Sequence, residues 1–185
     1  MASTFPKRLN DCTLDTFPNI EENKDIISWL KDFADNPQGR SALLLGTVGV
    51  GKTGLAVAAC RDYENKEVKD KYDFIIWRKA TFWPVTDLLD EIRNGYGKDW
   101  DILGDVKKVE FLCLDDLGVE RHNDWVDEKV FQIINYRYDM LLPTIITSNL
   151  TLEDMKEQFG ERVVSRFVGM AKIFQVKGRD LRRKQ

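Results

Sequence analysis

Apolar positions recur at helical spacing near the start of the chain and in short uninterrupted runs after it. Residues 23–35 carry apolar side chains on one helical face, and the Asn-Pro pair that follows predicts the end of this helix. Five later runs predict buried strands, at residues 42–45, 74–77, 110–116, 143–148 and 172–176. The segments with helical patterns are residues 55–65, 85–93, 126–141, 152–159 and 161–167. Because the strands alternate with helices and are apolar throughout, we expect an α/β fold, a five-stranded parallel sheet with helices on both faces.

Length and composition limit the organisation of the chain. A chain of 185 residues with 43% hydrophobic content can bury a full core, and we expect one domain. Within it, residues 1–40 form an N-terminal segment and helix, and residues 41–185 form the core with a short last strand and a basic tail. The net charge of −3 gives no overall basic surface, so any contact with nucleic acid must come from a local patch.

The cysteines and the N-terminal residues indicate the cellular compartment of the protein. Cys12, Cys60 and Cys113 are widely spaced, and a single histidine, His122, is available to join them, so a zinc site is not expected. Cys60 and Cys113 fall in a predicted helix and a predicted strand, where buried thiols point to a reducing compartment. We find no signal-peptide pattern and no run long enough to span a membrane. We therefore expect a cytoplasmic protein with no membrane partner.

A complete phosphate-binding loop follows the first predicted strand. The pattern GxxxxGKT is formed by Gly46, Thr47, Val48, Gly49, Val50, Gly51, Lys52 and Thr53. The glycines let backbone N–H groups turn toward phosphates, Lys52 adds a positive charge, and Thr53 offers a hydroxyl to a metal. This motif between a strand and a helix predicts binding of a nucleoside triphosphate with Mg²⁺.

Two acids end the third predicted strand. Asp115 stands where a carboxylate holds Mg²⁺, and Asp116 beside it can polarise the attacking water. A solvated strand end is the alternative interpretation. The pair indicates hydrolysis because it follows a phosphate loop in the chain.

Asn149 follows the fourth predicted strand, at the edge of the sheet where nucleotides bind. It can reach the γ-phosphate or the water. Asn149 or Thr151 could instead cap the next helix.

Two arginines four residues apart share one face of the last predicted helix. Arg162 and Arg166 could both point at the nucleotide of a neighbouring subunit, or could form surface ion pairs with Glu161 or Glu157. Arg137 is a weaker candidate and fits a structural role.

Basic and aromatic side chains are interleaved after the second predicted strand. Arg78, Lys79, Phe82 and Trp83 are candidates for binding single-stranded DNA, since rings stack on bases while cations hold phosphates. The alternative is that Trp77 and Phe82 belong to the core and the cations are solvated.

These motifs together resemble the AAA+ ATPases of the bacterial DnaC, DnaI and IstB group, the replicative-helicase loaders and their transposition relatives. The resemblance covers nearly the whole chain, and it rests on the segments GTVGVGKT, FLCLDDLGVE, IINYRYD, LPTIITSNL and GERVVSRF. It implies an AAA+ type P-loop NTPase fold, with adenine as the base.

The resemblance also implies residue roles. These are phosphate and Mg²⁺ binding for Lys52 and Thr53, metal binding for Asp115, catalysis for Asp116, sensing for Asn149, and a trans-acting finger at Arg166 with Arg162 beside it. Either Arg179 or Arg182 in the C-terminal tail serves near the nucleotide. One feature departs from the group, since an extra N-terminal domain that grips the helicase is not seen. The larger helical lid of other AAA+ proteins is also missing, and the group is known for having little of it.

The leading hypothesis is an oligomerising ATPase of DNA replication that binds single-stranded DNA and loads a replicative helicase. A transposition ATPase with a transposase partner is its close neighbour. A small-molecule phosphotransferase would need a basic lid, and the loop-rich residues 94–108 offer only Lys98, Lys107 and Lys108. A nucleotide-gated binding module with negligible turnover is the third class.

Overall fold

The computed structural model of the protein describes residues 5–18, 21–69, 71–95, 101–120 and 123–182. Its helices are the 3-10 turn η1 (Lys7–Leu9), α1 (Lys24–Asp35), α2 (Lys52–Asn65), α3 (Val85–Gly95), α4 (Ile102–Lys108), α5 (Asp124–Asp139) and α6 (Leu152–Met170). Its strands are β1 (Ser41–Leu45), β2 (Val68–Lys69), β3 (Ile75–Ile76), β4 (Ala80–Pro84), β5 (Phe111–Leu117), β6 (Thr144–Ser148) and β7 (Ala171–Gln175).

Five strands form one parallel sheet in the order β4-β5-β6-β1-β7. The strand β1 lies between β6 and β7, with Leu43 opposite Ile146 on one side and Ile173 on the other. All five strands run the same way, so their carboxyl ends meet at one edge. The phosphate loop, the two acids near the end of β5 and the polar end of β6 are therefore brought together, as the sequence predicted.

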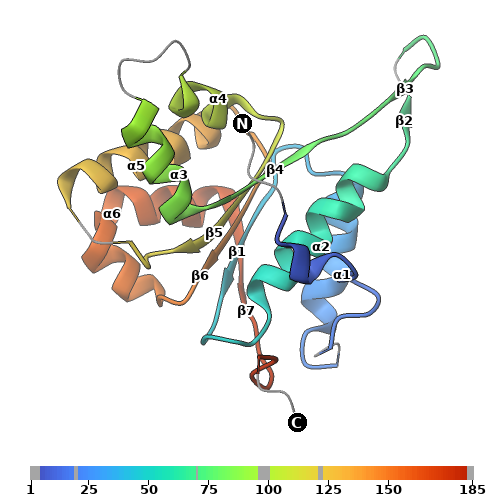
Figure 1. Cartoon of the computed structure of the whole chain (residues 1–185), viewed down its shortest axis with the longest axis horizontal. Coiled ribbons are helices and arrows are strands. Elements are labelled where there is room, and N and C mark those ends of the chain that lie inside the picture. The colour runs from blue at the N-terminus through green and yellow to red at the C-terminus, as the bar shows by residue number, and fades with distance from the viewer. Residues whose placement is uncertain (1–4, 19–20, 70, 96–100, 121–122, 183–185) are drawn as a thin grey trace.

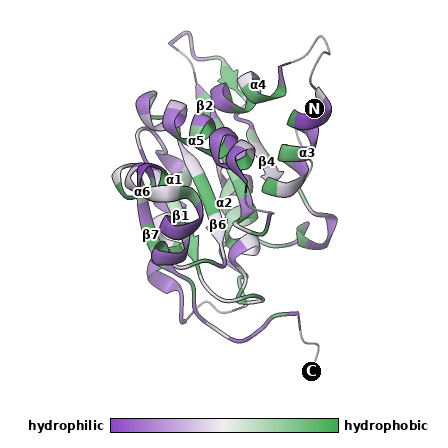
Figure 2. Cartoon of the chain, turned by 90° about the vertical axis from the view of Figure 1, so that its left-hand side faces the viewer, coloured by the Kyte–Doolittle hydropathy of each residue, from purple (hydrophilic) through white to green (hydrophobic). Residues whose placement is uncertain are grey.

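Helices cover both faces of the sheet, which confirms the predicted fold class. In Figure 1, α1 and α2 lie on one side, and α3 to α6 lie on the other. Successive residues of β1 alternate between two core clusters, Ala42 and Leu44 on the α2 side and Leu43 and Leu45 on the α6 side. Figure 2 shows hydrophobic residues concentrated on the strands, whereas the outer turns of the helices are largely hydrophilic.

The second strand of the sheet is a correction to the sequence prediction. Residues 74–77 were predicted to form it, but β4 at Ala80–Pro84 occupies that place, and β2 and β3 form a separate antiparallel hairpin. The exposed fractions of Phe74 and Trp77 are 69% and 79%. An apolar run alone does not decide burial, because the chain must also reach the sheet, and here the hairpin projects away from it (Figure 1).

Two further segments bear on the predicted helices. The stretch predicted as loop-rich contains α4, which begins at the cap Asp101, whose side chain accepts a hydrogen bond from Gly104 N at 2.9 Å. The predicted break between the last two helices is confirmed, since Gly160 has φ 81° and ψ 163° inside α6. Among the described helices, none is long and apolar enough to cross a membrane.

Candidate nucleotide-binding site

The phosphate loop runs from the buried end of β1 to the first turn of α2. Gly49 and Gly51 have φ values of 85° and 103°, which glycine adopts at little steric cost. A Cβ at Gly51 would lie 2.6 Å from the ring of Phe17, so packing also demands glycine there. The loop therefore follows a tight path into the N-terminus of α2, the end of a helix that attracts anions.

The ammonium group of Lys52 is held inside the loop. Its Nζ donates to the carbonyl oxygens of Gly46 and Thr47 at 2.9 Å each, and to Oδ1 of Asn149 at 2.7 Å. Burial lowers the pKa of Lys52, while the two neighbouring carboxylates oppose this shift. The structure thus brings Asn149 beside the lysine that the motif assigns to phosphate.

Asp115 is buried beneath the loop and accepts two hydroxyl hydrogen bonds. Thr53 Oγ1 donates to Asp115 Oδ2 at 3.1 Å, and Thr147 Oγ1 donates to Asp115 Oδ1 at 2.7 Å. Burial raises the pKa of Asp115, although both hydrogen bonds favour the ionised form. A cation beside Thr53 and Asp115 would offset the cost of burying this charge, and their oxygen atoms are the ligands that Mg²⁺ prefers.

Asp116 faces different surroundings because the strand pairing is irregular at this point. The register of β5 against β6 shifts between Leu114 and Leu117, and Asp116 has φ 56°. Its backbone N donates to Thr147 Oγ1 at 2.9 Å. The bulge separates the two acids: the side chain of Asp115 stays buried, and Asp116 borders the cavity beside the loop.

That cavity has a volume of about 430 Å³, which suits a nucleotide. Its polar wall includes Lys52, Thr53, Asp116 and Asn149. Its outer wall comes from both ends of the described chain and includes Arg8, Leu9, Cys12, Phe17, Pro18, Leu181 and Arg182. The apolar part of this wall is suited to cover a flat base.

Hydrogen bonds fix the C-terminal segment against the phosphate loop and against the N-terminal segment. Leu181 N donates to Gly49 O at 2.9 Å. The side chain of Asn23 exchanges two hydrogen bonds with the backbone of Lys177, at 2.7 and 2.9 Å. The cavity wall is therefore held by residues more than 150 positions apart.

Sequence reasoning did not find the N-terminal wall, because residues 5–18 carry no periodic pattern and no motif. At the other end, the structure distinguishes the two candidate arginines of the tail. Arg182 borders the cavity, and its charge is one of the influences that lower the pKa of Lys52. Arg179 does not border it.

Arg162 and Arg166 lie together in a different hollow of about 260 Å³ on α5 and α6. Arg166 Nε donates to Asn135 Oδ1 at 2.9 Å, and its guanidinium lies 4.8 Å from the centre of the Tyr138 ring. The guanidinium of Arg162 lies 5.6 Å from the centre of the Phe131 ring. Neither arginine borders the cavity at the phosphate loop of its own subunit.

Arg137 has a structural place. It is fully buried on α5 and donates five hydrogen bonds to neutral oxygens of α4, β6 and the segments beside them. Burial lowers its pKa to about 9, so it stays charged at neutral pH.

The predicted DNA patch is wrong for its two rings. Phe82 and Trp83 lie in the core, with exposed fractions of 1% and 6%, and cannot stack on bases. Arg78 is directed into the body, where it donates to Ala34 O at 3.1 Å. Lys79 is exposed. The burial of β4 between α2 and α3 accounts for the two rings. The alternative prediction, a core position, is confirmed for Phe82 and is wrong for Trp77, because the second strand of the sheet begins later than predicted.

The sequence model of the family described as IstB-like ATP binding protein matches residues 21–185. Among solved structures, the fold is similar to a crystal structure of the DnaC helicase loader, with a TM-score of 0.80 and 32% sequence identity, over 93% of this chain and 100% of that one.

Curated relatives include two replicative helicase loaders. DnaI of Bacillus subtilis (strain 168) is 28% identical over 137 residues, 72% of this chain and 41% of its own length. DnaC of Escherichia coli (strain K12) is 25% identical over 163 residues, 84% of this chain and 62% of its own length. The chain thus spans less than two thirds of the length of these relatives.

Proposed function

The chain belongs to the family of IstB-like ATP binding proteins, and from this premise we propose that it acts in DNA replication as a helicase-loader-like ATPase. The observation that carries the proposal is the joint position of four residues at one sheet edge, where Lys52 donates to Asn149 at 2.7 Å and Thr53 donates to Asp115 at 3.1 Å. This arrangement supports the binding of ATP and its hydrolysis rather than the binding of an anion alone.

The residues divide the work in the following way. Lys52 and the loop amides would hold the triphosphate, and Thr53 and Asp115 would hold Mg²⁺, which would neutralise charge on the phosphates. Asp116, at the cavity, accepts a proton from the attacking water and so acts as general base. Asn149 orients the water or the γ-phosphate.

Completion of the site by a neighbouring subunit is part of the proposal. Arg166, with Arg162 beside it, lies in the α5–α6 hollow and not at its own nucleotide cavity. We expect this hollow to face the nucleotide of the next copy, where a guanidinium stabilises the charge of the transition state. The active form is then a nucleotide-dependent homo-oligomer.

The remaining partners in the proposal are single-stranded DNA and a replicative helicase. A helicase is preferred to a transposase because the loaders DnaI and DnaC are the curated relatives described above. A cytoplasmic location fits the free thiols of Cys60 and Cys113, which are buried in α2 and β5.

The test is steady-state ATP hydrolysis per subunit over a series of protein concentrations, with and without single-stranded DNA. We expect turnover per subunit to rise with concentration and to change with DNA, since assembly supplies the missing arginine. Lys52→Ala, which removes the phosphate-binding charge, is the inactive control. Constant turnover per subunit along both axes would contradict the proposal.

A further inference from the structure

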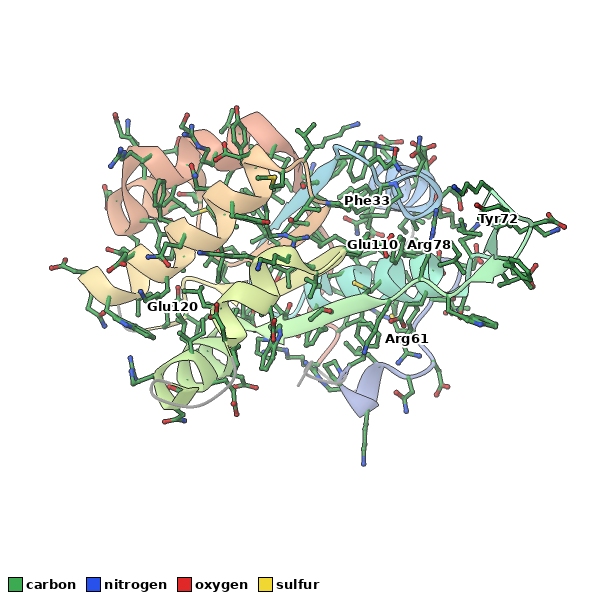
Figure 3. All side chains as sticks on the ribbon, turned by 90° about the horizontal axis from the view of Figure 1, so that it is seen from above. Phe33, Arg61, Tyr72, Arg78, Glu110 and Glu120 are labelled. Carbon is green, nitrogen blue, oxygen red and sulfur yellow. The ribbon has the colours of Figure 1, made fainter. Side chains whose placement is uncertain are left out.

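The hairpin formed by β2 and β3 carries a concentrated apolar surface. It projects from the body beyond the end of α2 (Figure 1), and Tyr72 lies at its far end (Figure 3). Five side chains on it are large, hydrophobic and exposed: Tyr72 (68%), Phe74 (69%), Ile75 (47%), Ile76 (48%) and Trp77 (79%). We call the described residues of this hairpin, 68–69 and 71–77, the apolar arm.

Both faces of the short strand β3 carry an exposed apolar side chain. Successive side chains of a strand point to opposite faces, so Ile75 and Ile76, which are 47% and 48% exposed, lie on opposite faces of the hairpin. Ile76 pairs with Val68 across the hairpin. A surface strand that packs on its own domain is apolar on one face only, so the pattern does not serve the core of this domain. A hairpin with exposed apolar side chains on both faces is suited to enter a groove of another molecule, where each face contacts one wall.

The base of the arm is held firmly. The Arg78 guanidinium donates to Ala34 O and lies 4.9 Å from the centre of the Tyr63 ring. Lys66 forms an ion pair with Asp35 at 2.6 Å. These contacts join the arm to the ends of α1 and α2, as Figure 3 shows for the position of Arg78. The arm is therefore presented in a set direction, which lowers the entropy cost of binding.

We propose that the apolar arm is a docking element that enters an apolar groove of a protein partner, the replicative helicase of the proposed function, on which this inference rests. Three exposed aromatic rings among five apolar side chains match the composition of binding hot spots. Together they expose on the order of 600 Å², near the roughly 800 Å² that each partner buries in a standard interface.

A protein groove fits the arm better than single-stranded DNA does. Ile75 and Ile76 offer no ring to stack on a base, but they gain from burial against apolar walls. The cations beside the rings are also engaged, since Lys69 pairs with Asp73 at 2.8 Å and Lys71 lies 4.9 Å from the centre of the Tyr72 ring. Asp73 would moreover repel phosphates.

The arm is also remote from the surface that ATP-dependent self-assembly would use. The helix α2 begins at Lys52 in the phosphate loop and ends at Asn65, just before the arm. A helix of 14 residues is about 21 Å long, so the two sites lie at opposite ends of it. A partner can thus occupy the arm while a neighbouring copy covers the nucleotide.

The experiment measures binding of the full chain, with ATP and Mg²⁺, to the purified replicative helicase hexamer encoded by the same genome, by biolayer interferometry. We expect Trp77→Ser to weaken binding about tenfold or more and Trp77→Phe to retain most of it. Met140→Ser is the matched control, because Met140 is 57% exposed at the end of α5 and should change nothing. Thermal unfolding and nucleotide affinity verify that the variants are folded.

Each outcome decides the inference. Loss of helicase binding in Trp77→Ser alone, with unchanged nucleotide affinity, supports it. Equal binding by Trp77→Ser and the unaltered chain overturns the docking arm and leaves the proposed function intact. No binding by the unaltered chain overturns both. If Trp77→Ser instead weakens only single-stranded DNA affinity, or only self-association in sedimentation, the occupant is nucleic acid or a second copy and the inference is wrong.

Discussion

Asp115 and Asp116 are neighbours in the chain and share one chemistry, yet their surroundings differ. Asp115 lies under the loop, where two threonine hydroxyls reach it, and a β-bulge turns Asp116 to the cavity. Burial makes the first carboxylate costly in its ionised form, which suits a metal ligand. The accessible position of the second suits a group that meets water.

At this scale we expect Asp115→Asn to stabilise the ligand-free protein at neutral pH. Burial raises the pKa of Asp115, so the carboxyl group holds its proton more tightly in the folded state than in the unfolded chain. The contribution of Asp115 to the free energy of unfolding is therefore present below the ordinary pKa of about 3.9 and lost as pH rises through the raised value. The Tm gain of the variant should be smallest near pH 4 and should grow toward neutral pH.

The same substitution removes a ligand of the proposed Mg²⁺ site. The unaltered protein should gain about 2.7 kcal/mol of stability from a non-hydrolysable ATP analogue with Mg²⁺ at 100 times its Kd. Asp115→Asn should lose the Mg²⁺-dependent part of this gain, whereas Asp116→Asn should keep it and lose turnover. An undiminished Mg²⁺ effect in Asp115→Asn would exclude the metal assignment.

At the scale of elements, Arg137 joins segments that the sequence pattern treats separately. It reaches the carbonyl groups of Val106 and Lys107 in the last turn of α4, and Thr144 in β6. A cation is favourable at the C-terminus of a helix, where carbonyl groups lack partners. The short helix α4 is thereby held against α5 and the sheet.

We expect Arg137→Met to lower the free energy of unfolding by about 3 kcal/mol or more, because several buried carbonyl groups lose their donor. This corresponds to a fall in Tm of roughly 6 to 12 °C. Arg137→Lys keeps the charge but offers fewer hydrogen-bond donors. Its Tm should therefore lie between that of Arg137→Met and that of the unaltered protein. If Arg137→Met unfolds with the Tm of the unaltered protein, the five hydrogen bonds do not stabilise the fold.

Two neighbouring apolar segments show that an apolar run does not by itself predict burial in the sheet. Residues 74–77 and the strand β4 both read as apolar, and only the second enters the sheet. Arg78, directly after the first run, donates to Ala34 O near the end of α1, and the strand β4 begins only beyond it. Local periodicity carries no information on such a distant contact.

At the scale of the whole molecule, the nucleotide cavity and the paired arginines lie in separate hollows. Under the proposed function, we expect a head-to-tail assembly, in which one copy supplies the loop and the next supplies the arginine. The loop half of the site can then be inactivated in one copy and the arginine half in another.

A mixing experiment tests this assignment. Asp116→Asn, which keeps nucleotide binding, and Arg166→Ala should each lack ATP turnover in assemblies, and an equal mixture should recover roughly a quarter of the unaltered activity under random association. The assay is phosphate release. A parallel experiment repeats the mixing with Arg162→Ala in place of Arg166→Ala. Absence of recovery in mixed assemblies, verified by light scattering, would show that Arg166 is not the trans-acting residue.

The sequence by itself determined the class of fold, the order of the helices except α4 and of the main strands except the second, the phosphate loop and the two acids. These follow from local properties, namely periodicity, glycine at defined spacing, and polar residues that end apolar strands. The bulge at Asp116, the cavity wall from both ends of the described chain, the position of Arg182 at the cavity and the exposure of the apolar arm were decided only by the tertiary structure. Each depends on contacts between residues far apart in the chain, such as Asn23 with Lys177, which no local pattern encodes.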